Sequence, residues 1–244
     1  MVVIGHSGAT GIHADTADPK RSASEFSWAT GSSPRVDSIY RRLLATHPDL
    51  AGNNVNLAVN GAKVGGLSRQ LDRLLDVRPT PDLVLVQVLD NDMRCDGTDP
   101  ANYAPFGASI DGVLDRLFHE IPDVQVFFTS PWADTELWTD WVGTHPDKRE
   151  RNSGTGPCAV FDEQGRRRPE GIRSQQEIID SYRSEIATAC ARHDGCFTDG
   201  GAELAFVPTD ADVGPDLAHL SIAGHRKYAE IAWQALPDAI RARP

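Results

Sequence analysis

The sequence predicts a doubly wound α/β fold of the flavodoxin type, with three α/β/α layers around a five-stranded parallel sheet of order 2-1-3-4-5. Two observations lead to this prediction. Short, almost continuous apolar runs are typical of parallel strands covered on both faces. They alternate along the 244 residues with segments of helical periodicity, and neither an internal repeat nor a linker interrupts them. We therefore expect one domain over residues 1–244, with right-handed crossovers.

Five apolar runs are the candidate strands, and the last of them is the weakest. In a sheet of parallel strands the carboxyl ends meet at one edge, and ligands bind beyond that edge in open α/β sheets. The residues that directly follow each run are therefore candidates for a functional site. The runs are 2–4, 55–59, 83–89, 124–128 and 196–198.

Four amphipathic segments between the strands are predicted as helices. Ser33 and Pro34 have the pattern of a cap and a first turn, ahead of an apolar face that extends to residue 44. Ser174 and Glu177 match a capping box ahead of the third segment. The four helices are expected over 34–44, 110–121, 174–186 and about 222–240.

One stretch, at about 132–173, is rich in Trp, Gly, Pro and charge and has little periodicity. We expect an irregular insertion there, because loops of this length are usually functional or mobile. Trp28, Trp132, Trp138 and Trp141 are predicted as core or as pocket wall, with Trp132 as a substrate-binding residue. The basic residues of the stretch form either a solvated lid or a surface that recruits an anionic substrate. They are Lys148, Arg149, Arg151, Arg166, Arg167, Arg168 and Arg173.

Charge and hydropathy exclude several classes of partner. The formal net charge is -11, from 24 Lys+Arg against 35 Asp+Glu. A surface this acidic repels nucleic-acid phosphates and anionic lipids. No apolar run approaches the roughly 18 residues that a membrane span needs, so we expect a soluble protein without a transmembrane segment. The oligomeric state is not readable from the sequence.

The four cysteines are predicted as two disulfides, Cys190–Cys196 and Cys95–Cys158. The spacing of the first pair suits a short local bridge, and the even count suits complete pairing; free thiols are the alternative. None of them forms a C-x-x-C pair, so no metal site is expected. Disulfides imply a secreted or extracytoplasmic protein. No signal peptide is visible, because Met1 runs directly into the first strand, so a leader would already have been removed.

Ser7 follows the first predicted strand in a run of small residues, 5–11, that allows a tight turn. The run lacks the Gly-Lys-Ser/Thr of a phosphate loop, and Ala9 replaces the last glycine of the G-x-S-x-G elbow. Taken alone, Ser7 reads as a turn residue. Near the other end of the chain, Asp216 precedes His219 by three residues, a spacing that lets a carboxylate orient an imidazole as the base for a serine.

Two further residues follow the second and third strands. The backbone N–H of Gly61 and the side-chain amide of Asn91 are both donors of the kind that stabilises a developing oxyanion. Each alone is typical of a turn. Because Ser7, Gly61 and Asn91 follow three different strands, they are expected at the same edge of the sheet.

The segments around Ser7, Gly61, Asn91 and His219 follow one another in this order, and with them the chain resembles the SGNH (GDSL-like) hydrolase family. The segment 90–97 resembles secreted actinobacterial esterases and lipases. The resemblance implies the SGNH hydrolase fold, with Ser7 as nucleophile, His219 as general base and Asp216 as its partner. It also implies an oxyanion hole made by the N–H groups of Ser7 and Gly61 and the amide of Asn91, and it implies no cofactor. The blocks are Gly5-His6-Ser7, Asn56-Leu57-Ala58-Val59-Asn60-Gly61, Leu89-Asp90-Asn91-Asp92 and Asp216-Leu217-Ala218-His219.

Two positions depart from the family pattern, which usually has Asp at His6 and Gly at Leu89. Neither carries the chemical step, so we expect activity to survive. His6 is expected as a structural substitute that also borders the substrate pocket. Other histidines are interpreted more simply: His225 caps or packs the last helix, and His13 lies with Asp15 and Asp18 in a solvated loop rather than at a metal.

The expected activity is hydrolysis of carboxylic esters, with short acyl chains favoured, through an acyl-enzyme. The substrate would be a small-molecule, lipid or acylated carbohydrate ester. Two alternatives stay open. One is transfer of the acyl group to a sugar or lipid alcohol, and the other is a non-catalytic carbohydrate- or lipid-binding module on the same fold, which only His6 and Leu89 favour.

Overall fold

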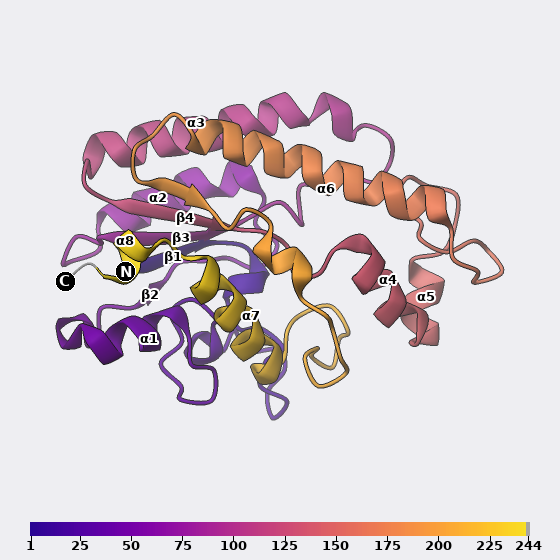
Figure 1. Ribbon diagram of the computed structural model, residues 1–244, viewed down its shortest axis with the longest axis horizontal. Helices are drawn as coiled ribbons and strands as arrows, with labels where there is room; N and C mark the ends of the chain where they lie inside the picture. Colours follow the sequence, from indigo (N-terminus) through magenta and orange to yellow (C-terminus); the bar gives the residue numbers. More distant parts are fainter. Residues whose placement is uncertain (243–244) are drawn as a thin grey trace.

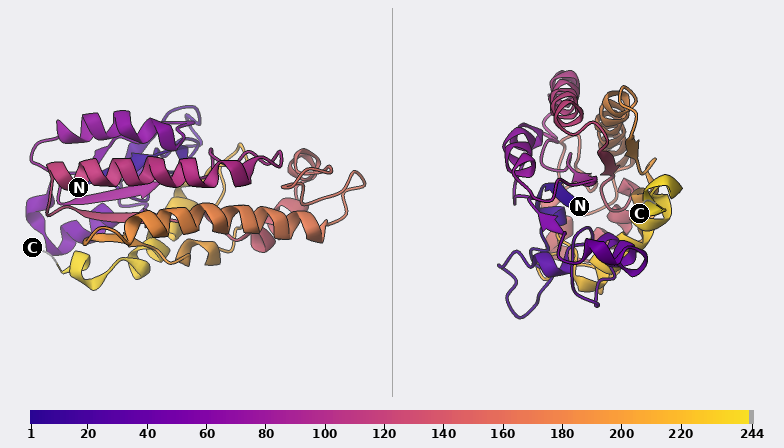
Figure 2. Two further views of the ribbon diagram at one scale, coloured as in Figure 1. Left: turned by 90° about the horizontal axis from the view of Figure 1, so that it is seen from above. Right: turned by 90° about the vertical axis from the view of Figure 1, so that its left-hand side faces the viewer.

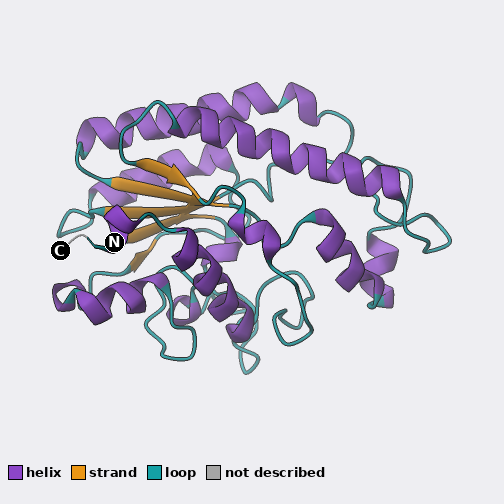
Figure 3. Ribbon diagram, viewed as in Figure 1, coloured by secondary structure: helices purple, strands orange, loops and turns teal. Residues whose placement is uncertain are grey.

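The computed structural model describes residues 1–242, and in this part of the chain five parallel strands form one sheet of order β2-β1-β3-β4-β5 (Figure 3). This confirms the predicted fold class and strand order. Two predicted runs end early, at Asn56 and Gln87, as the chain turns out of the sheet. The strands are β1 (Val2–Gly5), β2 (Val55–Asn56), β3 (Leu83–Gln87), β4 (Gln125–Thr129) and β5 (Cys196–Thr198).

Helices cover both faces of the sheet, as the end-on view in Figure 2 shows. On one face lie α2 (Leu67–Leu75), α3 (Tyr103–Glu120) and α6 (Pro169–Cys190), and on the other α1 (Ile39–Thr46) and α7 (Ile222–Ala235) (Figure 1). Successive strand residues point to opposite faces. Accordingly Val84 and Val86 pack in the core between the sheet and α2, α3 and α6, whereas Leu85 packs in the core between the sheet and α1 and α7.

Three helix boundaries differ from the prediction. Helix α1 begins at Ile39, because Asp37 has a positive φ of 55° and the Ser38 side chain caps the helix instead of Ser33. Helix α6 begins at Pro169, so Ser174 lies inside the helix and no capping box forms there. At the C-terminus Leu236 is extended ahead of Pro237, which separates α7 from a short α8 (Asp238–Arg241).

The insertion at 132–173 is more regular than predicted. It contains α4 (Thr135–Gly143), which Asp134 caps, and α5 (Pro146–Arg151), which begins at a proline. These helices lie beyond the carboxyl edge of the sheet (Figure 1). Helix α4 packs on a small separate core, and α5 lies against α4. The core is formed by Trp141, Val142, Val160, Phe161, Ile172 and Val213.

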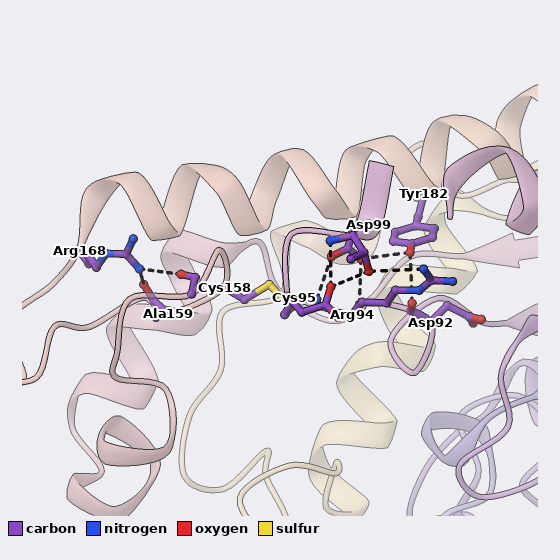
Figure 4. The surroundings of a disulfide bond; sticks show 11 residues. Asp92, Arg94, Cys95, Asp99, Cys158, Ala159, Arg168 and Tyr182 are labelled. Carbon is purple, nitrogen blue, oxygen red and sulfur yellow. Dashed lines mark hydrogen bonds between the residues drawn. A yellow bond between two sulfur atoms is a disulfide. The ribbon is translucent and has the colours of Figure 1, made fainter. Parts of the chain in front are cut away.

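All four cysteines are paired as predicted, in Cys95–Cys158 and Cys190–Cys196. Figure 4 shows that the first disulfide ties the loop after β3 to the insertion. Both ends of this link are held by hydrogen bonds: Asp99 accepts from the Cys95 N–H at 2.8 Å, and Arg168 donates to the Ala159 carbonyl at 2.9 Å. Within residues 1–242, none of the helices combines the length and apolar character that crossing a bilayer requires.

Candidate active site

The three residues expected to form a catalytic triad lie together at the carboxyl edge of the sheet. Ser7 opens a short 3₁₀ turn directly after β1, and Asp216 and His219 lie in the loop before α7. His219 Nε2 is 2.9 Å from Ser7 Oγ, and His219 Nδ1 is 2.6 Å from Asp216 Oδ2. The imidazole therefore bridges the hydroxyl and the carboxylate, which is the arrangement that makes a serine nucleophilic.

The carboxylate of Asp216 is held in its charged form. Burial alone would raise the pKa of Asp216, but hydrogen bonds from the His219 ring and from the N–H groups of His219 and Ala218 outweigh it and hold the pKa below its usual range. A charged Asp216 favours the tautomer of His219 with its proton on Nδ1. That tautomer leaves Nε2 free to accept the Ser7 proton.

Ser7 is placed by an unusual exit of the chain from β1. Gly5 has φ +131°, and a Cβ atom there would lie 1.9 Å from the Gln87 carbonyl oxygen, so only glycine fits. Gln70, from α2, clamps the same residue: Gly5 N–H donates to Gln70 Oε1 at 2.6 Å, and Gln70 Nε2 donates to the Gly5 carbonyl at 2.9 Å. These buried contacts fix the direction in which the chain enters the Ser7 turn.

Two of the expected oxyanion donors are free. Within residues 1–242, no hydrogen-bond acceptor is found for the backbone N–H of Ser7 or of Gly61. Gly61 has φ +73°, and no atom lies within 4 Å of where a Cβ would be, so the backbone conformation rather than crowding favours glycine there. The Asn91 amide donates to the Ala62 carbonyl at 3.0 Å, which ties the loop after β3 to the glycine loop.

Further hydrogen bonds connect the three loops. Thr10 Oγ1 donates to Asn60 Oδ1 at 2.7 Å, and Asn56 Nδ2 donates to the Ala9 carbonyl at 2.8 Å, so the loop after β2 is joined to the Ser7 turn. Both carboxylate oxygens of Asp92 accept from the Val64 N–H, at 3.1 and 3.0 Å. The edge is therefore one connected polar network, which favours preorganised donors.

His6 lies beneath this network, with its side chain only 6% exposed. Its Nδ1 accepts a hydrogen bond from the Gly8 N–H at 3.0 Å and so caps the Ser7 turn, as a carboxylate in this position would. Its Nε2 lies 2.8 Å from Asp90 Oδ2. The burial and these two contacts indicate the structural role predicted for His6, and His6 is not among the residues that line the pocket described next.

A pocket of about 200 Å³ adjoins the loop that carries Asp216 and His219. Trp132 and Trp138 form part of its wall, Leu217 and Ala218 connect it to the triad loop, and Lys148 reaches it from α5. Burial lowers the pKa of Lys148, while the nearby Asp216 charge opposes this shift. The other two tryptophans of the prediction, Trp28 and Trp141, are buried in the cores.

The basic residues of the insertion mostly do not face this pocket. Arg167 pairs with Glu136 and Asp140, Arg166 with Asp162 at 2.7 Å, and Arg168 with Glu170 at 2.8 Å. Of the seven basic residues, only Lys148 lines the pocket. Internal ion pairs therefore use much of the positive charge that the sequence suggested for recruiting an anionic substrate.

Two histidines outside the triad differ in how well the sequence predicts them. His225 packs in α7 as expected, and full burial lowers its pKa to about 3. His13 is not in a solvated loop: its ring stacks on His219 with centroids 5.2 Å apart and planes 19° apart. His13, Asp216 and His219 place three possible metal-donor atoms within 4.8 Å of one another.

Sequence reasoning missed the residues that support the site from within the fold. Gln70 lies on α2, which the sequence analysis did not predict. Gln87 carries a signal that was readable, since it is the one polar residue in the apolar run 83–89. Its Oε1 accepts from the Trp28 indole at 3.0 Å, and its Nε2 donates to the Tyr228 hydroxyl at 3.2 Å.

A family model described as the GDSL-like Lipase/Acylhydrolase family matches residues 4–227. The chain belongs to this family and is therefore a carboxylic ester hydrolase. No curated protein matches the chain in sequence.

Among solved structures, the chain is similar to TesA, with 12% identity, a TM-score of 0.55 and 96% of each chain covered. It is also similar to a family 3 carbohydrate esterase from Clostridium thermocellum, with 14% identity, a TM-score of 0.53 and 96% and 92% covered. An extracellular lipase from Streptomyces rimosus matches with 19% identity, a TM-score of 0.50 and 96% and 98% covered. At these identities, the likeness concerns the fold.

Proposed function

We propose that the protein is a serine esterase that hydrolyses carboxylic esters through an acyl-enzyme at Ser7. The observation that carries the proposal is the continuous chain of contacts from Ser7 Oγ to His219 at 2.9 Å and from His219 to Asp216 at 2.6 Å. A hydroxyl, an imidazole and a carboxylate in this order supply a nucleophile, a general base and the charge that stabilises the imidazolium.

In the proposed reaction Ser7 Oγ attacks the ester carbonyl carbon while His219 Nε2 takes the hydroxyl proton. The tetrahedral intermediate collapses, the C–O bond to the leaving alcohol breaks, and His219 returns the proton to that oxygen. Water then attacks the acyl-serine, again deprotonated by His219, and the carboxylic acid leaves as Ser7 regains its proton. Asp216 stays ionised throughout, because its pKa lies below the usual range.

The negative charge that develops on the carbonyl oxygen is assigned to the N–H groups of Ser7 and Gly61 and the side chain of Asn91. The first two are free donors within residues 1–242, and Asn91 is fixed beside the glycine loop by its bond to Ala62. Loss of one such donor typically lowers the rate about 100- to 1,000-fold.

The pocket of about 200 Å³ beside the triad is assigned to the acyl or alcohol part of the ester, with Trp132 as its aromatic wall. A volume of this size favours short acyl groups. His6 and Leu89, on which a non-catalytic module would rest, both lie outside the proton-transfer chain. The two disulfides support an extracytoplasmic location, and an Ellman titration of the unreduced protein that detects free thiols would contradict it.

The test is hydrolysis of p-nitrophenyl acetate and butyrate by the wild type, Ser7→Ala and His219→Ala, with His119→Ala as an exposed-histidine control. We expect both triad variants to lose activity by at least about 1,000-fold and the control to be unchanged. Wild-type turnover that persists in Ser7→Ala would refute the site. Product that forms faster with an added alcohol than with water would instead favour acyl transfer.

A further inference from the structure

His13 lies against the general base of the proposed reaction from a distant part of the sequence. Its ring is stacked on that of His219, with centroids 5.2 Å apart and an interplanar angle of 19°. Its Nε2 is 3.6 Å from Asp216 Oδ2, which is beyond hydrogen-bond distance but within the range of a charge interaction. His13 thus touches both residues that must stay aligned with Ser7.

The backbone around His13 is firmly placed. His13 has a positive φ of 61°, a conformation in which His is enriched among non-glycine residues. Its N–H donates to the Pro19 carbonyl at 3.1 Å, and the neighbouring Ile12 forms an antiparallel bridge with Ser22. The ring is therefore carried by an ordered turn rather than by a free loop.

The loop of the triad packs directly on this turn. At Gly214 a Cβ atom would lie 2.8 Å from the His13 carbonyl oxygen, so a larger residue would separate the two segments. Gly214 N–H in turn donates to the His219 carbonyl at 2.7 Å. His13 and His219 are consequently linked through the backbone as well as through their rings.

We propose that His13 is a positioning residue for the base: its ring covers one face of His219 and keeps the imidazole in line between Ser7 and Asp216. The inference rests on the proposed function, because it concerns the same proton-transfer chain. His219 is held at its two nitrogens by single contacts, at 2.9 and 2.6 Å, and these contacts leave the tilt of the ring free. Stacking restricts that tilt, and displacement of a reacting group by about 1 Å costs about 100-fold in rate.

The test compares the wild type with His13→Asn and His13→Phe. Asn tolerates the positive φ and removes the ring, whereas Phe retains an aromatic face. With p-nitrophenyl butyrate we expect kcat of His13→Asn to fall about 10- to 100-fold while KM changes less than about twofold, because the pocket is untouched. We expect His13→Phe to recover most of the loss, and His119→Ala to match the wild type.

A second readout does not require turnover. A proton in a hydrogen bond as short as that between His219 Nδ1 and Asp216 resonates far downfield in the ¹H NMR spectrum. We expect this signal in the wild type and in Ser7→Ala, and expect it to broaden or disappear in His13→Asn. Thermal unfolding of each variant establishes that it is folded before its rate is compared.

The outcomes separate the two proposals. A wild type without esterase activity but with the downfield signal, lost in His13→Asn, refutes the proposed function and retains the positioning role. Unchanged kcat and an unchanged signal in His13→Asn overturn the positioning role, as does an equal loss in folded His13→Phe. Wild-type activity that responds to EDTA while the His13 variants do not would also overturn it, because the three donors would then bind a metal.

Discussion

The chain leaves both β1 and β3 through a residue with a positive φ, but this residue is a glycine at one exit and a leucine at the other. At the end of β1, Gly5 has φ +131° and the Gln87 backbone lies where a side chain would be. Two residues beyond the end of β3, Leu89 has φ +114°. The residue is 1% exposed and packs in the core on the α2, α3 and α6 side of the sheet. A glycine adopts this conformation without strain, whereas a leucine needs the free energy of burial to offset it.

The family usually has glycine where Leu89 stands, and the surroundings of the two residues show why a side chain is tolerated at Leu89 but not at Gly5. The space beside Gly5 is already occupied by backbone, so nothing can be gained there by adding a side chain. At Leu89 the side chain enters the core and recovers about 1.5–3 kcal/mol by leaving water, comparable with the roughly 1–3 kcal/mol of strain. Strand exits beside an active site thus differ in which residues they permit according to what packs behind them.

The largest effect is expected when a side chain is added to Gly5 at the end of β1. In Gly5→Ala the new Cβ would lie 1.9 Å from the Gln87 carbonyl oxygen, so the strands must separate. We expect a loss of about 4 kcal/mol or more in the free energy of unfolding and loss of esterase activity. Gly52→Ala is the matched control, because Gly52 has φ +79° and no atom lies within 4 Å of where its Cβ would be. It should cost only about 1–2 kcal/mol, and equal losses in urea unfolding would contradict the role assigned to the clash.

The second prediction separates strain from burial at the β3 exit. Leu89→Ala removes buried side chain but keeps the strain, so it should cost about 2–5 kcal/mol. Leu89→Gly removes both, and we expect it to be about 1 kcal/mol more stable than Leu89→Ala. Leu85, buried within β3, is the control: there glycine should be less stable than alanine by about 0.5–1 kcal/mol. The same order of stability at both positions would show that Leu89 carries no strain.

A smaller effect is expected at His6, which follows Gly5 and contacts Asp90 in the loop after β3. His6→Ala leaves the Gly8 N–H without its side-chain acceptor, so we expect a loss of about 1 kcal/mol and a several-fold lower kcat as the Ser7 turn loosens. His6→Asp supplies a carboxylate that can accept the same hydrogen bond and should recover most of the activity. Steady-state kinetics on p-nitrophenyl acetate measures both variants. A His6→Asp enzyme as slow as His6→Ala would contradict the capping role.

The last effect is confined to a limited range of pH. Burial raises the pKa of Asp92, in the loop after β3, although the Val64 N–H opposes the shift. As pH rises above about 3.9, the unfolded carboxyl ionises first, so the folded state loses stability until the pH passes the folded pKa. Relative to wild type, Asp92→Asn should therefore gain stability over this interval, by about 1.4 kcal/mol for each unit of pKa shift.

Urea unfolding between pH 3.5 and 7 measures this gain, with Asp18→Asn as an exposed control. A difference between wild type and Asp92→Asn that does not vary with pH would refute the assigned direction.

Much of the fold was predictable because its signals are local. The apolar runs identified the five strands, and the spacing of Cys190 and Cys196 identified a local disulfide. The prediction failed where a contact from elsewhere overrides local preference. At the start of α1 the N–H groups of Ile39 and Tyr40 donate to the Trp28 and Ala29 carbonyls, so the helix begins after Ser33 and Pro34. The core around Trp141 orders α4 in a stretch without clear periodicity.

The sequence by itself located five strands along the chain and singled out Ser7, Asp216 and His219 as candidate site residues, because hydrophobic periodicity and short motifs are properties of neighbouring residues. Only the tertiary structure decided that Gln70 clamps Gly5, that His6 caps the Ser7 turn beside Asp90, and that His13 stacks on His219. Most of these contacts join residues far apart in the chain. Such pairs meet only when the sheet and its crossovers bring their loops to one edge, and no local pattern encodes that distance.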